Sequence, residues 1–185
     1  MVYLVDRRVT ATLSLNDLIP GHPVMRGLLQ PDLSFDGSIL AFRSSGTTRE
    51  ELWRMSPPEG ISFPITNAAT RGGSMGFQPP ALSESGRFLA FDHFSDDLGV
   101  GNSMGTFDVF VWDECRDGSS PCVPLLRCLT GVLPDGTPTT MGSGSPRLSA
   151  DGSHVVFISA DPLDPNVPAT PGVQRIYIAP TGLRE

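Results

Sequence analysis

The string "GGSMG", residues 72–76, has the form G-x-S-x-G, in which the central Ser74 would be the nucleophile of a hydrolase. In hydrolases this string makes a strained turn from a strand into a helix, which exposes the serine hydroxyl. Here "FQPPALS" follows at once. Its two prolines, Pro79 and Pro80, exclude that helix, because proline lacks an amide donor and clashes with the preceding turn. We therefore interpret residues 72–76 as a loop and assign no catalytic residue in this chain.

Three cysteines, Cys115, Cys122 and Cys128, lie in "DECRDGSSPCVPLLRC". Neither a fourth cysteine nor a nearby histidine completes the four ligands of a zinc site. Cys115 and Cys122 bracket a loop with an Asp117-Gly118 turn pair, so the chain can double back and bring their Cα atoms within disulfide range. We predict a Cys115–Cys122 disulfide, which implies an oxidising compartment. Cys128 is expected inside a strand as a small buried side chain.

Carboxylates gather in two long loops, "SDDLGVGNSMGTFD" and "DPLDPNVPATPG", and oxygen ligands of this kind suit calcium. Neither loop has the regular ligand spacing of an EF-hand. Solvated carboxylates are therefore the simpler interpretation, and no cofactor is expected. The histidines add no metal site, since His154 replaces an apolar strand residue of two similar strings, and His22 and His93 lack a partner at ligand spacing. The weak calcium candidates are Asp96, Asp97, Asp108, Asp161 and Asp164.

The length, composition and net charge of the chain favour some classes of protein over others. A chain of 185 residues fits one domain, and its 20 glycines and 18 prolines favour short strands and turns over helices. The net charge of −7 disfavours a nucleic-acid binder, which normally carries a basic face. No apolar run approaches the roughly 18 residues that span a bilayer. The start, "MVYLVDRRVTATLSL", alternates like a strand and lacks the layout of a signal peptide, so any export signal lies outside this chain.

One template, Gly-x3-Pro-x-Leu-Ser-x2-Gly-x4-Phe, occurs at residues 27–42, 76–91 and 142–157. Each copy contains a turn pair, Asp-Gly or Ser-Gly, followed by a short strand, "ILAF", "FLAF" or "VVF". These strands are apolar on both faces, so we expect them to be buried on both sides. We interpret each copy as a hairpin. The turn glycines are expected to have positive φ, and the last aromatic residues to occupy equivalent buried positions. These structural repeat residues are Gly37, Gly86 and Gly152, and Phe42, Phe91 and Phe157.

A second string recurs as "VYLVD", "LWRMS", "VFVWD" and "IYIAP", each with an aromatic residue in second place. A third, weaker string follows three of these as "ATLSL", "SFPIT" and "LRCLT". If the four strands of a repeating unit are named a to d, the chain has the order c–d, a–b–c–d, a–b–c–d, a–b–c. Four-stranded antiparallel units repeated along a chain are typical of β-propeller blades.

The "P-x-LS-x-DG-x-x-x-AF" string, followed by "VFV-x-D" and "LT", resembles the TolB-like (WD-like) family of propeller repeats. The resemblance covers almost the whole chain, and the first copy departs from it at Ser56, where the usual residue is aspartate. The same repeat type occurs in the propellers of prolyl-oligopeptidase-like enzymes and in many exported bacterial proteins. The resemblance implies an all-β fold and a periplasmic or extracellular location, but a fold of this kind does not imply an activity.

Three blades do not close a ring, because propellers have at least four. We expect a single propeller-type domain over residues 1–185, with blades at 1–26 (strands c and d only), 27–75, 76–141 and 142–185 (strand d missing). Either the chain is part of a longer propeller, or blades from two or more chains complete one ring. An open arc would expose apolar sheet faces and unpaired edges.

The sequence therefore predicts a binding or scaffold module without catalytic activity, with a protein partner or self-association, no nucleic acid and no membrane span. One alternative is the propeller portion of a larger, prolyl-oligopeptidase-like hydrolase whose catalytic residues lie outside this chain. Another is a self-assembling structural subunit. A neighbouring hydrolase domain in the reading frame would favour the first alternative, whereas further "LS-x-DG" repeats alone would favour the binding module.

Overall fold

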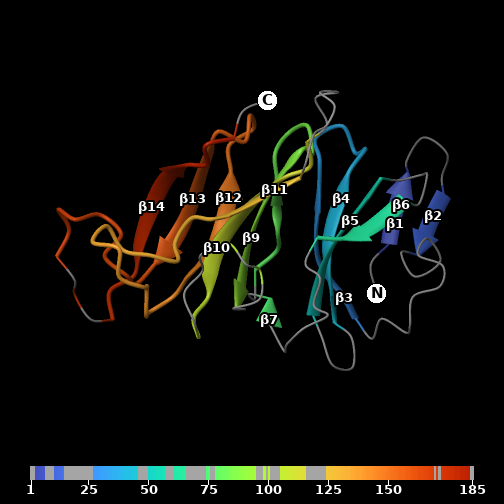
Figure 1. Ribbon diagram of the computed structural model, residues 1–185. Helices are drawn as coiled ribbons and strands as arrows, with labels where there is room; N and C mark the ends of the chain where they lie inside the picture. The colour runs from blue at the N-terminus through green and yellow to red at the C-terminus, as the bar shows by residue number, and fades with distance from the viewer. Residues whose placement is uncertain are drawn as a thin grey trace.

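The computed structural model shows an all-β chain in which four antiparallel sheets stand side by side in chain order (Figure 1). The structure describes residues 3–6, 11–14, 27–45, 50–56, 61–65, 74–75, 78–94, 98, 100, 105–115, 124–168, 170 and 172–183. Within this described part, no helix has the length and apolar character needed to cross a bilayer. The predicted all-β propeller class is confirmed, and the sheets do not close into a ring.

The first two sheets come from the N-terminal third of the chain. Sheet 1 pairs β1 (Tyr3–Asp6) with β2 (Ala11–Ser14). Sheet 2 has the order β3-β4-β5-β6, with each strand next to its neighbour in the sequence. Its strands are β3 (Gly27–Leu33), β4 (Leu40–Ser45), β5 (Glu50–Ser56) and β6 (Ile61–Pro64).

The other two sheets follow the same plan. Sheet 3 has the order β11-β10-β9, and both β7 and β8 pair with β9. Its strands are β7 (Ser74–Met75), β8 (Ala81–Leu82), β9 (Phe88–Phe94), β10 (Asp108–Asp113) and β11 (Leu125–Cys128). Sheet 4 has the order β12-β13-β14. Its strands are β12 (Ser143–Leu148), β13 (His154–Ser159) and β14 (Arg175–Pro180).

The order of these strands is the one that the repeated strings predict. The predicted blade boundaries remain a proposal, except at one place where the pairing differs. β7, Ser74–Met75, pairs with β9 and so belongs to sheet 3, although the boundary was predicted after residue 75. The boundary was predicted at Gly76 because this is the first residue that the three copies share. The first shared residue of a repeat need not be the first residue of a sheet.

The first strand of sheet 2 and the first strand of sheet 4 each contain an irregularity just before the repeat proline. The register with the next strand shifts between Leu29 and Asp32 in sheet 2, and between Gly144 and Arg147 in sheet 4. At these shifts Gln30 and Ser145 take positive φ values of 52° and 57°. The equivalent residue of sheet 3 is Pro79, whose ring holds φ near −65°. In sheet 3, β7 and β8 are separate strands, and residues 76 and 77 between them lie outside the described residues.

The predicted aromatic positions are equivalent in all three larger sheets. Each b-strand phenylalanine pairs across the ladder with the aromatic residue of the following strand: Phe42 with Trp53, Phe91 with Phe110, and Phe157 with Tyr177. All three phenylalanines are at most 2% exposed. The rings of Phe91 and Phe110 stack with centroids 5.5 Å apart, and those of Phe157 and Tyr177 at 5.8 Å. Such pairs stabilise a sheet beyond the area they bury.

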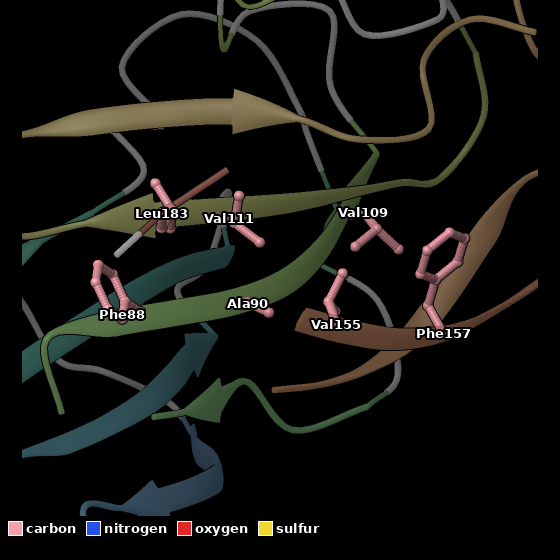
Figure 2. Close-up of a cluster of buried hydrophobic side chains, with 7 residues drawn as sticks. All are labelled: Phe88, Ala90, Val109, Val111, Val155, Phe157 and Leu183. Carbon is pink, nitrogen blue, oxygen red and sulfur yellow. The ribbon is translucent and has the colours of Figure 1, made fainter. Parts of the chain in front are cut away.

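One cluster of buried apolar residues joins sheets 3 and 4. Figure 2 shows its seven side chains, which come from β9, β10, β13 and the C-terminal Leu183. The members are Phe88, Ala90, Val109, Val111, Val155, Phe157 and Leu183. The two sheets therefore share a continuous core in the way of neighbouring propeller blades.

The strand "VVF" of the third copy was predicted to be buried on both faces, and this is wrong for the residues that face away from sheet 3. β9 is buried over its first six residues, whereas buried and exposed residues alternate along the first four residues of β13. Val155 and Phe157 are buried, but Val156 is 38% exposed. The reason is that β13 belongs to the last sheet, so that no further sheet in the described part of the chain covers its outer face.

Candidate functional site

The repeated "LS-x-DG" string forms a hairpin turn that is tied by its own side chains. The predicted positive φ is found at Gly37, Gly86 and Gly152, where it is 75°, 73° and 68°. In the first copy the Ser34 hydroxyl accepts the Ile39 amide at 2.9 Å and donates to Asp36 at 2.8 Å. Asp36 in turn accepts the Ser38 amide at 2.9 Å.

The third copy repeats these contacts, with Ser149 donating to Asp151 at 2.6 Å. The Ser149 bond is the main reason why the pKa of Asp151 falls to about 2, and bonds from Ser153 lower it further. In the second copy Ser85 replaces the aspartate, and its hydroxyl accepts the Arg87 amide at 3.3 Å. Serine, aspartate and glycine in this string thus build the turn, which is a structural role.

Successive turns are also joined to one another. The amide of Phe35 donates to the carbonyl of Glu84 at 3.1 Å, and the amide of Glu84 donates to the carbonyl of Ala150 at 2.8 Å. These three residues occupy the same position of the repeat in sheets 2, 3 and 4. The turns therefore form a continuous line of hydrogen bonds across the arc.

Charged side chains reinforce the junction between sheets 2 and 3. Arg54 of β5 is 1% exposed and makes an ion pair with Glu114, which follows β10. Within sheet 3, Arg87 makes two parallel bonds to Asp113, from Nε at 2.8 Å and from Nη2 at 3.0 Å. A buried arginine needs such an anionic partner. We therefore interpret the Arg54–Glu114 ion pair as a structural contact between sheets 2 and 3.

Ser74 lies in β7 and pairs in register with Phe94. The interpretation of residues 72–76 as a loop is therefore wrong for Ser74 and Met75, which form a strand. Residues 72, 73 and 76 lie outside the described residues, so the absence of a nucleophile turn stays a prediction.

The calcium candidates that the structure describes do not form a group that could hold a metal ion. Asp96 and Asp97 lie outside the described residues. The Asp108 carboxylate accepts the hydroxyl of Thr130 at 3.0 Å, and both oxygens of Asp161 accept backbone amides of residues 140–142 at 3.0 to 3.1 Å. Asp164 accepts the amide of Asn166 at 2.8 Å. Among the described residues no group of three or more histidines, cysteines and acids could hold a metal ion.

The described histidines and cysteines do not form a metal-binding group either. His93 is buried on β9 and His154 is the exposed first residue of β13, while His22 lies outside the described residues. Cys115 follows β10. Cys128, on β11, is free and half-buried. Cys122 lies outside the described residues, so the Cys115–Cys122 pairing stays a prediction.

The structure also singles out a residue that was not predicted from the sequence, Asp92. It follows Phe91 on β9, is 6% exposed, and lines a cavity of 230 Å³ between sheets 3 and 4. Burial raises the pKa of its carboxyl to about 6, although its own amide and the charge of Arg43 act in the opposite direction. A carboxylate inside the apolar run "FLAFDHF" is the sequence signal that could have identified it.

No protein-family model matches the chain, and no curated protein matches it. Among solved structures, TolB from Acinetobacter baumannii superposes with a TM-score of 0.53 at 15% identity, over 99% of this chain and 36% of that one. A structure described as TolB from Agrobacterium tumefaciens gives 0.51 at 20% identity, over 91% and 50%. The chain has the fold of the TolB-type β-propeller.

A further structure with a similar TM-score comes from an enzyme. The tricorn protease superposes with a TM-score of 0.55 at 12% identity, over 95% of this chain and 15% of that protein. The chain spans only a third to a half of the two TolB structures. At these identities the likeness shows the propeller arrangement of the sheets, and it assigns no activity, partner or location to the chain.

Proposed function

We propose that this chain is a binding module without catalytic activity, built from TolB-type propeller blades, in a bacterial protein exported to the periplasm or beyond the cell. Its partner is a protein that presents an apolar surface to the outer face of sheet 4. The predicted disulfide between Cys115 and Cys122 supports the oxidising location, as does the resemblance of the repeats to those of exported proteins.

This proposal rests on a difference in exposure between equivalent residues of β10 and β14. On β10, Val109 and Val111 are fully buried, because sheet 4 packs against them. The equivalent residues of β14 are Ile176 and Ile178, which are 74% and 71% exposed. Large apolar residues grouped at such exposure are typical of a surface that binds another protein. The equivalence also indicates the kind of surface that fits, namely the face of another sheet.

A photo-crosslinking amino acid at Ile178 tests this proposal in cells that naturally make the protein. We expect it to capture a defined envelope protein whose purified form then binds the purified chain. Val132 is also exposed, at 55%, but lies in the loop after β11, and a crosslinker there is the matched control. Ile176→Lys should weaken binding of the purified partner at least tenfold. Equal capture from both positions, or an unchanged affinity of the Ile176→Lys variant, would contradict the proposal.

Two alternatives are each favoured by one observation. The likeness to the tricorn protease favours the propeller portion of a larger hydrolase, with catalytic residues outside this chain. In that case a longer parent protein would hydrolyse peptides. The second alternative is a self-assembling subunit, favoured by a second exposed apolar group on β3 of sheet 2 and the turn that follows it: Leu29, Leu33 and Phe35 are 44%, 46% and 85% exposed. A molar mass that rises with concentration would then be observed by light scattering.

A further inference from the structure

The cavity that Asp92 lines is formed where sheet 4 meets sheet 3. Asp92 contributes from β9 and Phe107 from just before β10, while Met141, Gly144 and Ile158 contribute from the side of sheet 4. Its volume of 230 Å³ is below the roughly 300–1,000 Å³ of sites for drug-sized ligands. The cavity therefore suits a single side chain or a small ion.

Asp92 differs from the other buried carboxylates of this region. Asp108 accepts the hydroxyls of Thr130 and Thr139, and Asp161 accepts three backbone amides. The Asp92 carboxylate is 6% exposed, and the interactions that favour its charged form are a hydrogen bond from its own amide and the charge of Arg43. A largely buried carboxylate with so little support costs free energy, and such groups are typical of sites that a ligand completes.

The residues at the same repeat position show that Asp92 is not needed to build the fold. They are Arg43 in sheet 2 and Ile158 in sheet 4. Arg43 bonds from Nη1 to the Gln30 side chain at 2.6 Å, within its own sheet. Ile158 is apolar and forms part of the cavity wall. A strand position that accepts an arginine, an aspartate or an isoleucine is not fixed by packing alone.

The backbone of β12 leaves room beside the carboxylate. A Cβ on Gly144 would lie 3.0 Å from Oδ2 of Asp92. The absence of a side chain at residue 144 therefore leaves space next to this oxygen. The next residue, Ser145, has a φ of 57° and lies at the register shift of β12. Irregularities of this kind often occur next to functional sites.

We propose that this cavity binds a primary ammonium group on an aliphatic stem, the end of a lysine side chain from a protein partner. The Asp92 carboxylate accepts a charge-assisted hydrogen bond from the ammonium, and Phe107 and Ile158 contact the methylene groups. A metal ion fits less well, because the described residues supply no group of three acids, histidines or cysteines at this site. This inference rests on the proposed function, since it requires that the chain binds a protein.

Nα-acetyl-lysine N-methylamide is the probe, and the norleucine analogue, which has the stem without the ammonium, is its control. Both are titrated into the folded chain at pH 8, where Asp92 is ionised because its pKa is about 6. Amide NMR signals of residues 142–144 report binding. The lysine compound should bind at least tenfold more tightly than the norleucine compound, since a hydrogen bond to a charged group contributes about that factor. Equal binding, or no binding at millimolar concentrations, would overturn the inference.

Two variants locate the site. Asp92→Asn removes the charge, and Gly144→Ala places a methyl group against the carboxylate while leaving the charge in place. Both should weaken binding of the lysine compound about tenfold, whereas Asp135→Asn, at an exposed hairpin carboxylate, should not. Unchanged binding in both cavity variants would exclude this cavity. The failure of this inference remains distinguishable from that of the proposed function, because a partner that binds only through Ile176 and Ile178 would still be captured from Ile178.

Discussion

Gly152, in the turn of sheet 4, lies directly against the ring of Phe88 on β9 of sheet 3. A Cβ on residue 152 would lie 2.8 Å from Cγ of Phe88, closer than side-chain carbons approach. Gly86 has the same relationship to Ile39 of sheet 2, at 2.7 Å. The turn glycine therefore permits both the positive φ of the hairpin and the contact with the preceding sheet.

This relationship predicts unequal effects of two identical substitutions. Gly37 has the same positive φ, but nothing lies within 4 Å of a Cβ placed on it. Gly37→Ala should lower the free energy of unfolding by about 1 kcal/mol, from backbone strain alone. Gly152→Ala should lower it by about 1–3 kcal/mol more, because the methyl group overlaps the Phe88 ring. Urea denaturation of both variants measures the difference, and equal losses would show that sheets 3 and 4 do not pack in this way.

The stacked aromatic pair in sheet 3 predicts the most damaging core substitution. Phe91 is 1% exposed, stacks on Phe110 and belongs to a cluster with Leu52 of sheet 2. Phe91→Ala should lower the free energy of unfolding by about 3–5 kcal/mol. Val156→Ala, on the face of sheet 4 that no described sheet covers, should cost less because Val156 is 38% exposed. A Phe91→Ala variant that melts like the unchanged protein would refute the assignment of this strand.

Asp92 predicts an unusual dependence of stability on pH. Its carboxyl has a pKa of about 6 in the folded chain and near 3.8 when unfolded, so the folded state binds the proton more tightly. Its contribution to stability is therefore fully present below pH 3.8 and is lost as the pH rises through 6. Asp92→Asn should match the unchanged protein near pH 4 and be more stable by up to about 3 kcal/mol at pH 8. A stability difference that stays constant from pH 4 to pH 8 would contradict this assignment.

The cysteines predict a defined pattern of alkylation. Cys115 and Cys122 should be found as one linked peptide by mass spectrometry of unreduced protein from an oxidising compartment. Burial raises the pKa of the Cys128 thiol to about 11, and the nearby charge of Asp108 adds to this shift. Cys128 should therefore react slowly with iodoacetamide at pH 8 while the chain is folded, and fully after unfolding, because the thiolate is the reactive form. Three free thiols in such a preparation would remove the disulfide and its support for export.

The turns and the strand order were predictable because they depend on short-range rules. The pair Asp151-Gly152 indicates a hairpin from glycine's access to positive φ, and Phe91 indicates a buried strand from its apolar neighbours. Asp92 was missed although its place in the apolar run "FLAFDHF" indicates burial, because the cavity beside it forms only where sheet 4 meets sheet 3. The exposure of Ile178 was missed for the same reason, since "IYIAP" and "VFVWD" look alike until a neighbouring sheet covers one and leaves the other open.

Amide hydrogen exchange at three equivalent turn residues is the most direct test of the side-by-side arrangement of the sheets. The amides of Phe35 and Glu84 donate to carbonyls of the next turn, whereas the amide of Ala150 donates to no acceptor in the described part of the chain. We expect Phe35 and Glu84 to exchange slowly, although both side chains are exposed, and Ala150 to exchange rapidly. Three hairpins that do not pack as consecutive blades would show rapid exchange at all three residues, and that result would contradict the arrangement described for this chain.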